Sequence, residues 1–334
     1  MVFHLLALLP LLPSVSAWGT LGHNTVALIA QNLISNKTAS FAQSLLNDTS
    51  SNYLLNVATW ADSYRSEPDG RFSSVYHYID AFDSPPSSCE VDYDRDCPEE
   101  GCIVSAIANY TTRVAARNIS HVERQKALKW IIHFVGDIHQ PLHVENLAVG
   151  GNLINVTFNG TNTNLHAIWD SNIPNKLVGG SKISDAHAWA DELTTAVEIG
   201  KFAKQSKKWL RGINIHDSIS TAMIWANDAN DFICSTVVPK GEAAVKFQEL
   251  SGGYYESAVP VVEMQIAKAG VRLAAWLDLI VTGKVGKGGY GGKKGGKKGY
   301  TKRSTERREV KLEEWMLEAR RAREAVGGCS GHEH

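Results

Sequence analysis

The sequence of 334 residues lacks an apolar run long enough to cross a membrane. Its N-terminal apolar run, Leu5–Leu12, has 8 residues, whereas a membrane-spanning helix needs about 20. Pro13 and small residues up to Ala17 follow this run, which is typical of a secretory signal peptide. We therefore expect residues 1–17 to be removed, so that the mature chain begins at Trp18 and is secreted to the extracellular space.

Cysteine is scarce, with 5 residues in the whole chain. In an oxidising compartment, the four cysteines of the main body would form two disulfides, for which three pairings are possible. Closely spaced cysteines can also bind zinc, but the secretory signal favours disulfides. The four are Cys89, Cys97, Cys102 and Cys234, and the fifth, Cys329, lies in the C-terminal tail.

The chain also lacks a surplus of charge of either sign, since its formal net charge is −1. This balance hides an uneven distribution: from Lys284 onward there are 14 Lys/Arg and 7 Asp/Glu, whereas the rest has 20 and 28. An acidic body argues against broad electrostatic capture of duplex nucleic acid, which requires many contacts from Lys and Arg to phosphates. It leaves open a site in which metal ions supply the positive charge.

The hydrophobic content of 43% is sufficient for one large core, and the periodicity predicts a mainly α-helical single domain at residues 18–283. Residues 284–334 form a Gly/Lys-rich basic extension, which we expect to be disordered apart from a charged helix at 306–326.

A strand at 152–158 turning at Asn159-Gly160 predicts a small β-hairpin. Residues 73–80 are expected to be extended because they are rich in aromatic and β-branched side chains. Helices are expected near residues 18–35, 38–47 with Thr38 as the cap, 56–65, 103–117, 121–140, 185–205, 217–230 and 256–281 with Pro260 in the first turn.

Six N-glycosylation sequons are consistent with secretion, since each has Asn followed by x-Ser/Thr without an intervening proline. So many acceptor sites in one chain favour a glycoprotein. They are Asn36, Asn47, Asn109, Asn118, Asn155 and Asn159.

Two His-x-x-x-Asp motifs are the strongest chemical signal in the sequence. His133 and Asp137 lie four residues apart in a predicted helix, so that imidazole and carboxylate project from the same face. His166 and Asp170 repeat this spacing. A single such pair is more often part of a solvated helix face, but two pairs among apolar neighbours favour metal binding.

The mature chain contains nine candidate metal ligands, more than one ion requires. Imidazoles and carboxylates without a thiolate suit zinc or another borderline divalent ion. The alternative for any single histidine is a core or surface role, to which we assign His121, His139, His187 and His216. The nine candidates are the Trp18 terminus, His23, Asp62, His77, His133, Asp137, His143, His166 and Asp170.

Seven motifs between Trp18 and Val281 carry a resemblance to a known family. They are Trp18-Gly19, Gly22-His23, Trp60-Ala61-Asp62, Tyr76-His77-Tyr78, the segment from His133 to His143 (HFVGDIHQPLH), Gly150-Gly151-Asn152 and His166-x-x-Trp169-Asp170. Together they resemble the zinc-dependent, single-strand-specific nucleases of type I. In that family a mostly α-helical domain, shared with zinc-dependent phospholipase C, holds three zinc ions at the bottom of a cleft.

The resemblance implies a distribution of the ligands over three zinc ions. It assigns Asp62, His77, His133 and Asp137 to one ion. It assigns the amine and carbonyl of Trp18, with His23 and Asp137, to a close neighbour, so that Asp137 bridges the pair. It assigns His143, His166 and Asp170 to the third.

The resemblance also implies roles near the substrate and a disulfide pairing. Asp62, Arg65 and Asp137 would act in catalysis, with Arg65 and Asn152 near the scissile phosphate. Asp80 would recognise a nucleobase, and Tyr78 stands where a family member has a stacking phenylalanine. The pairing implied is Cys97 with Cys102 and Cys89 with Cys234.

The expected function is therefore that of a secreted tri-zinc endonuclease acting on single-stranded DNA and RNA. The resemblance implies cleavage of the 3′ P–O bond to give 5′-phosphate products, with 3′-nucleotidase activity, in a monomer without a stable protein partner or membrane association. The alternative on the same scaffold is a zinc-dependent phospholipase C, which Tyr78, Asp80 and Asn152 disfavour. A glycoprotein with purely structural metals is disfavoured because His143, His166 and Asp170 leave positions open for water and substrate.

Overall fold

The computed structural model describes residues 18–285 and Arg321; the expected signal peptide and nearly all of the expected tail, including its charged helix, lie outside the described residues. The described body is mainly α-helical with one small antiparallel hairpin, as predicted. The α-helices are α1 Thr20–Leu33, α2 Asn36–Leu46, α3 Trp60–Tyr64, α4 Tyr93–Asp96, α5 Ile103–Val114, α6 His121–Asp137, α7 Leu165–Ala167, α8 Ile173–Val178, α9 Ile183–Glu198, α10 Ala203–Trp209, α11 Ser218–Phe232 and α12 Gly253–Thr282. Shorter 3₁₀ turns are η1 Leu55–Val57, η2 Arg71–His77, η3 Pro141–Val144 and η6 Glu242–Ala244, and π-helical turns are η4 Ile168–Asn172 and η5 Ile233–Val237.

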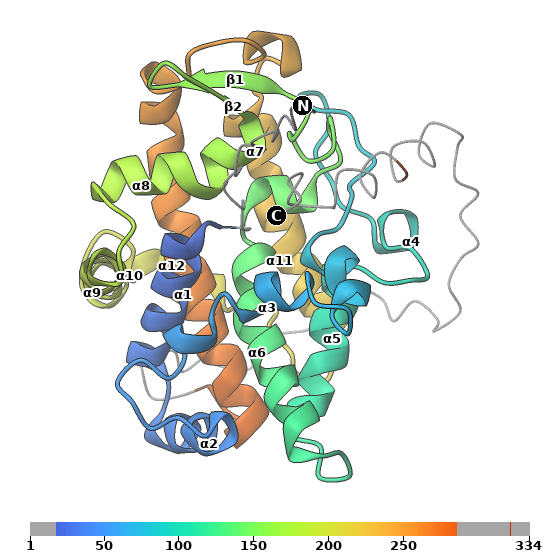
Figure 1. Ribbon diagram of the computed structural model, residues 1–334, viewed down its shortest axis with the longest axis vertical. Helices are drawn as coiled ribbons and strands as arrows, with labels where there is room; N and C mark the ends of the chain where they lie inside the picture. Colours follow the sequence, from blue (N-terminus) through green and yellow to red (C-terminus); the bar gives the residue numbers. More distant parts are fainter. Residues whose placement is uncertain (1–17, 286–320, 322–334) are drawn as a thin grey trace, which may run out of the picture.

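The 30-residue helix α12 runs along the longest axis of the molecule beside α1 and α6 (Figure 1). Its closest approach to α1 depends on Gly270, because a Cβ at that position would lie 2.6 Å from Cβ of Ile29. Such a contact would push the two helices apart. Gly270 therefore lets α1, which carries His23, lie directly against the central helix.

The hairpin of β1 Asn155–Phe158 and β2 Thr161–Asn164 lies at one end of the molecule (Figure 1). Its register pairs Asn155 with Asn164 and Phe158 with Thr161, with Asn159 and Gly160 in the turn, as predicted. Both turn residues have positive φ, 51° and 73°, which suits the tight turn that Asn-Gly favours. The hairpin leads directly into α7 and η4, where the second His-x-x-x-Asp motif lies.

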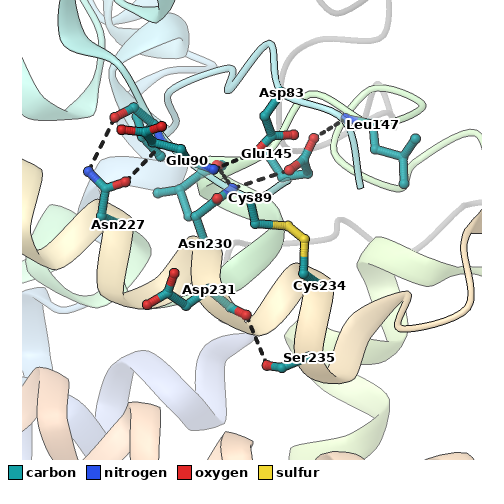
Figure 2. Close-up of a disulfide and its surroundings, with 12 residues drawn as sticks. Asp83, Cys89, Glu90, Glu145, Leu147, Asn227, Asn230, Asp231, Cys234 and Ser235 are labelled. Atoms are coloured by element: carbon teal, nitrogen blue, oxygen red, sulfur yellow. Dashed lines mark hydrogen bonds between the residues drawn. A yellow bond between two sulfur atoms is a disulfide. The ribbon is translucent and has the colours of Figure 1, made fainter. Parts of the chain in front are cut away.

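Two disulfides, the number predicted, hold the loop before α5. Cys97 is bonded to Cys102, and Cys89 is bonded to Cys234 in η5, which is the pairing implied by the resemblance. Figure 2 shows the carboxyls of Asp83 and Glu145 close to the second bridge. Burial raises the pKa of Glu145 well above its ordinary value and the pKa of Asp83 to about 6, so this pair holds protons that exposed carboxyls would release.

The prediction of an extended segment at residues 73–80 is wrong for most of its length. Residues Arg71–His77 form the 3₁₀ helix η2, and extended backbone begins at Tyr78. Both the backbone N–H of Ser73, at 2.9 Å, and its hydroxyl, at 2.6 Å, donate to the carbonyl of Gly70. Such local side-chain bonding competes with strand formation and overrides the β-propensity of the segment.

Three helix boundaries also differ from the predictions. Ser35 rather than Thr38 caps α2, since the Ser35 hydroxyl accepts the backbone N–H of Thr38 at 3.3 Å. The expected helix at 185–205 is two helices, α9 and α10, separated at Ile199–Phe202. Pro260 lies inside α12 because the helix begins at Gly253, before the predicted start. The carbonyl of Glu256 loses its helical donor there, but Glu256 is exposed and water can hydrogen-bond to it.

Candidate metal centre and nucleotide pocket

Helix α6 ends in the core with the first His-x-x-x-Asp motif on one face. Ser120 caps the start of α6 by accepting the N–H of Glu123 at 3.2 Å, and the helix ends at Asp137 before Pro141. His133 and Asp137 are both fully buried, and His133 Nε2 lies 3.2 Å from Asp137 Oδ2. The predicted helical spacing thus brings imidazole and carboxylate together.

Asp137 lies at the centre of the first cluster, and its two oxygens face different imidazoles. Oδ1 is 3.1 Å from His23 Nε2, whereas Oδ2 is 2.9 Å from His77 Nδ1 and 3.2 Å from His133 Nε2. Asp62 completes this region, with Oδ1 at 3.5 Å from His133 Nε2. A carboxylate with one oxygen on each side is the geometry that a bridging ligand requires.

The ring of His23 fits against α6 because residue 136 is glycine. A Cβ on Gly136 would lie 2.9 Å from His23 Nδ1, closer than real Cβ contacts allow. His23 instead stacks on His133, with ring centroids 3.9 Å apart. Gly136 therefore serves the site directly, a role that the sequence analysis did not assign.

The second cluster contains His143 from η3 together with His166 from α7 and Asp170 from η4, the two elements that follow the hairpin. His166 Nε2 lies 3.1 Å from Asp170 Oδ2, and His143 Nε2 lies 3.7 Å from Asp170 Oδ1. All three side chains are fully buried. The chain turns at Pro141, at the start of η3, so that His143 returns toward the same region.

Backbone carbonyls fix the orientation of three of these imidazoles. His133 Nδ1 donates to Ala58 at 2.7 Å, His143 Nδ1 to His77 at 2.9 Å and His166 Nδ1 to Gly150 at 2.6 Å. Because a carbonyl only accepts hydrogen bonds, each Nδ1 carries a hydrogen, and each Nε2 faces its cluster, where it can bind either a proton or a metal ion. This outer-sphere bonding is typical of histidines that bind metals.

Gln140 holds the carboxylate of Asp170 and was not singled out from the sequence. Its Nε2 donates to Asp170 Oδ1 at 2.6 Å while its Oε1 accepts the N–H of Leu142 at 2.6 Å. The side chain is fully buried. The amide thus fixes one oxygen of Asp170 and leaves the other toward His166. The available signal was the position of Gln140 directly before Pro141, where it caps η3.

The electrostatics of the first cluster favour positive charge. Burial alone would lower the pKa of His133, but the carboxylates of Asp137 and Asp62 raise it to about 10. Burial also raises the pKa of Asp137, yet His133, His23 and His77 outweigh this effect and hold it well below its ordinary range. Burial and the Arg65 guanidinium lower the pKa of His77 to about 4, so that His77 is neutral at physiological pH.

The donor set passes a simple test for metal binding. Within the described part of the chain, His23 Nε2 and Asp137 Oδ1 are buried 3.1 Å apart, as are His166 Nε2 and Asp170 Oδ2, yet none of the four atoms forms a well-aligned hydrogen bond. Buried polar atoms rarely lack partners unless an ion or water binds them. The atoms converge in three groups whose members lie within 4.8 Å of one another: His23, His133 and Asp137; Asp62, His77 and His133; and His143, His166 and Asp170. Imidazole and carboxylate donors in such groups suit a borderline divalent ion.

Trp18 is the expected ligand for which the structure gives indirect support only. Its side chain is fully buried, and the N–H of the next residue, Gly19, donates to the backbone carbonyl of Asp170 at 2.7 Å. This bond fixes the backbone next to Trp18 beside the second cluster.

The expected substrate residues lie in three places. Tyr78 and Asp80 line one pocket of about 330 Å³, and Arg65 lies beside the first cluster, with Nη2 at 3.3 Å from Asp62 Oδ1. Asn152 is absent from the described lining of this pocket; its Nδ2 donates to Val149 at 2.9 Å, near the turn that orients His166. The other lining residues are Val75, Ile79, Asp96, Pro98, Glu100, Gly101, Cys102 and Arg321.

His139, which was assigned a core or surface role from the sequence, belongs to none of the three groups. His139, although fully buried, donates from Nδ1 to the carbonyl of Val135 at 2.7 Å, and its Nε2 lies 2.9 Å from Arg272 Nη1. Both ring nitrogens are therefore engaged in the core. This placement agrees with the predicted core role.

Comparison with known proteins gives a consistent assignment. The model of the S1/P1 Nuclease family matches residues 18–282. Nuclease S1 from Aspergillus oryzae is 52% identical over 265 residues, which are 79% of this chain and 92% of the relative. Nuclease P1 from Penicillium citrinum is 48% identical over 270 residues, 81% of this chain and 100% of the relative. Endonuclease 2 from Arabidopsis thaliana is 32% identical over 287 residues, 80% and 92% of the two chains. With the whole helical body matched and both His-x-x-x-Asp motifs in place within it, the chain belongs to the S1/P1 nuclease family.

Proposed function

We propose that this protein is a secreted, zinc-dependent endonuclease that cleaves single-stranded DNA and RNA at the 3′ P–O bond and removes the phosphate of 3′-nucleotides. One observation carries the proposal: the imidazoles and carboxylates converge in three buried groups, and Asp137 has an oxygen facing each of two histidine sets. Membership of a nuclease family supports a phosphodiester substrate and not the phospholipase C alternative.

Three zinc ions would be held by the groups already described. Asp62, His77, His133 and Asp137 would hold the first, and His23 with Asp137 and the amine and carbonyl of Trp18 would hold the second. His143, His166 and Asp170 would hold the third. The bond between Gly19 and Asp170 supports an N-terminal ligand, because it fixes the backbone next to Trp18.

Zinc ions bound at such a site lower the pKa of water, neutralise the phosphate and stabilise the departing oxygen. The chain then has no need to supply a nucleophile of its own. Arg65, 8% exposed and held by Asp62, is placed to hydrogen-bond a phosphate oxygen beside the first cluster. A guanidinium suits this role because its planar fork matches two phosphate oxygens.

The preference for single strands would come from the pocket of Tyr78 and Asp80. The phenol ring of Tyr78 offers a stacking surface, and the carboxylate of Asp80 accepts hydrogen bonds from the edge of a base. A base in a duplex must leave its stack and its partner to reach this pocket, at a cost of a few kcal/mol. A single-stranded base largely avoids that cost.

Two features support secretion. All six sequon asparagines, including Asn155 on the outer face of β1, are exposed. Two disulfides are formed. Among the described residues, no helix is both long and apolar enough to span a membrane. We propose that the secreted form acts as a monomer.

The test compares one oligonucleotide as a single strand and as a duplex. We expect rapid cleavage of the single strand, products that carry 5′-phosphates, and loss of activity with a chelator that zinc restores. Equal cleavage of the duplex would refute the base pocket, and products with 3′-phosphates would refute the proposed bond cleavage.

A further inference from the structure

Phe72 is an unusually exposed aromatic residue close to the metal centre. Its side chain is 56% exposed, and among the described residues the other strongly exposed phenylalanine is Phe247, at 71%. Phe72 lies near the start of η2, the element that ends at His77 of the first cluster. A single exposed phenylalanine needs no functional explanation, but three further features distinguish this one.

The first feature is continuity with the pocket. Phe72 meets Tyr76 edge-on, with ring centroids 5.9 Å apart and planes at 73°. Tyr76 in turn lies against Gly101, where a Cβ would be 2.8 Å from Tyr76 Cε1. Gly101 lines the pocket that contains Tyr78. An unbroken series of contacts therefore leads from the pocket to the exposed ring.

The second feature is a fixed backbone. The Ser73 hydroxyl donates to Gly70 at 2.6 Å, and the N–H of Arg71 donates to Glu67 at 3.1 Å. With a rise of about 2 Å per residue in a 3₁₀ helix, Phe72 lies about 10 Å along η2 from His77. This separation is short enough for a neighbouring nucleotide of a strand bound at the metal centre. A ring on a fixed backbone loses little conformational entropy when a base stacks on it.

The third feature is the adjacent cation. Arg71 is exposed and forms no ion pair with another residue of the described body. Its guanidinium is available to a phosphate next to a base on Phe72. Glu67 and Asp69 are exposed in the preceding turn. Where these carboxylates lie within a Debye length of the bound phosphate, their repulsion offsets part of its attraction to Arg71. Stacking should consequently contribute more than charge.

We infer that Arg71 and Phe72 form an additional subsite for one nucleotide of single-stranded DNA or RNA, outside the pocket of Tyr78 and Asp80. A base stacks on Phe72 and the adjoining phosphate contacts Arg71. The subsite extends the substrate path along η2 and requires a strand longer than one nucleotide. This inference rests on the proposed function, and substrate length separates the two.

The experiment measures kcat and KM of the full mature protein on a 3′-mononucleotide and on a single-stranded oligonucleotide. Phe72→Ala should raise KM for the oligonucleotide about 5-fold, the lower end of the range for loss of one stacked base, with kcat unchanged. The mononucleotide, which is too short to reach Phe72, should show no change. Phe72→Tyr keeps the ring and should restore KM, and the effect should persist at high salt because stacking dominates.

Phe247→Ala is the matched control, because Phe247 is also strongly exposed and has a neighbouring cation, Lys246, 5.9 Å from its ring centroid. It should leave both substrates unaffected. Equal KM for Phe72→Ala and Phe247→Ala on the oligonucleotide would overturn the subsite. A parallel rise of KM for Phe72→Ala on the mononucleotide would also overturn it, because such a change would indicate a disturbed metal centre. Wild-type turnover of both substrates tests the proposed function on its own. Fluorescence anisotropy with a cleavage-resistant phosphorothioate oligonucleotide tests the subsite without turnover, and equal affinity of wild type and Phe72→Ala would refute it.

Discussion

Replacing Asp137 with asparagine should disable two metal positions at once. Oδ1 of Asp137 lies 3.1 Å from His23 Nε2, and Oδ2 lies 2.9 Å from His77 Nδ1. An amide keeps one of these oxygens and puts an N–H donor in the place of the other. It also removes a negative charge. The surrounding imidazoles hold the pKa of Asp137 well below its ordinary value, so that its carboxyl is ionised in the native protein. Both ions that share Asp137 would therefore lose affinity.

The size of the effect follows from the number of ions involved. Disturbing an outer-sphere partner of one metal costs about 10- to 100-fold in affinity or activity, and loss of a direct ligand should cost at least as much. With two ions affected, we expect the nuclease rate of Asp137→Asn to fall by about 10²- to 10⁴-fold. Asp170→Asn is the matched control, because Asp170 faces His143 and His166 in one cluster.

The assay is zinc content by mass spectrometry after gel filtration, combined with the cleavage rate on a single-stranded oligonucleotide. Asp137→Asn should retain about one zinc ion and Asp170→Asn about two. If Asp137→Asn retained as many ions as Asp170→Asn, the bridging role of Asp137 would be refuted. Wild-type zinc content with a wild-type rate would also refute its role as a ligand.

Three further predictions follow from single contacts. Gln140→Ala should leave the fold intact but weaken the third zinc ion about 10- to 100-fold, since the amide that orients Asp170 is lost; chelator titration measures this, and unchanged affinity would contradict it. Asp83→Asn should raise the melting temperature at pH 7.5 and leave it nearly unchanged at pH 4.5. The reason is that burial raises the pKa of Asp83 to about 6, so that the folded state binds more protons than the unfolded state and stability falls as pH rises from about 4 to 6; equal melting shifts at both pH values would contradict this. One extra residue before Trp18 should abolish an N-terminal amine ligand and lower both zinc content and rate; removal of that residue by a specific protease should restore both, and equal values before and after removal would refute the amine ligand.

Helical periodicity predicted the framework of the site well. The segment from His133 to Asp137 has spacing that only a helix turns into a shared face, and α6 confirms it. The turn that brings back His143 begins at Pro141, whose ring cannot continue a helix by donating an N–H. These features are local, so that the sequence contains all the information required. The resemblance supplied what periodicity could not, namely that His23 and His77 lie beside Asp137 although both are far from it in sequence.

The failures have the opposite cause, because they depend on competing interactions or on tertiary contacts. Residues 73–77 form a 3₁₀ helix despite their β-propensity, because Ser73 makes two hydrogen bonds to the carbonyl of Gly70. The roles of Gln140 and Gly136 arise from side chains of distant elements, Asp170 in η4 and His23 in α1. No pattern within α6 alone could have identified these partners.

The central claim is a three-zinc centre that cleaves single strands, and stepwise reconstitution tests it most directly. Zinc is added in fractions of an equivalent to the metal-free mature protein, while the cleavage rate and the end groups of the products from a single-stranded oligonucleotide are measured. The account predicts that the rate reaches its maximum only at three equivalents and that the products carry 5′-phosphates. Full activity with one equivalent or none, or products carrying 3′-phosphates, would contradict it.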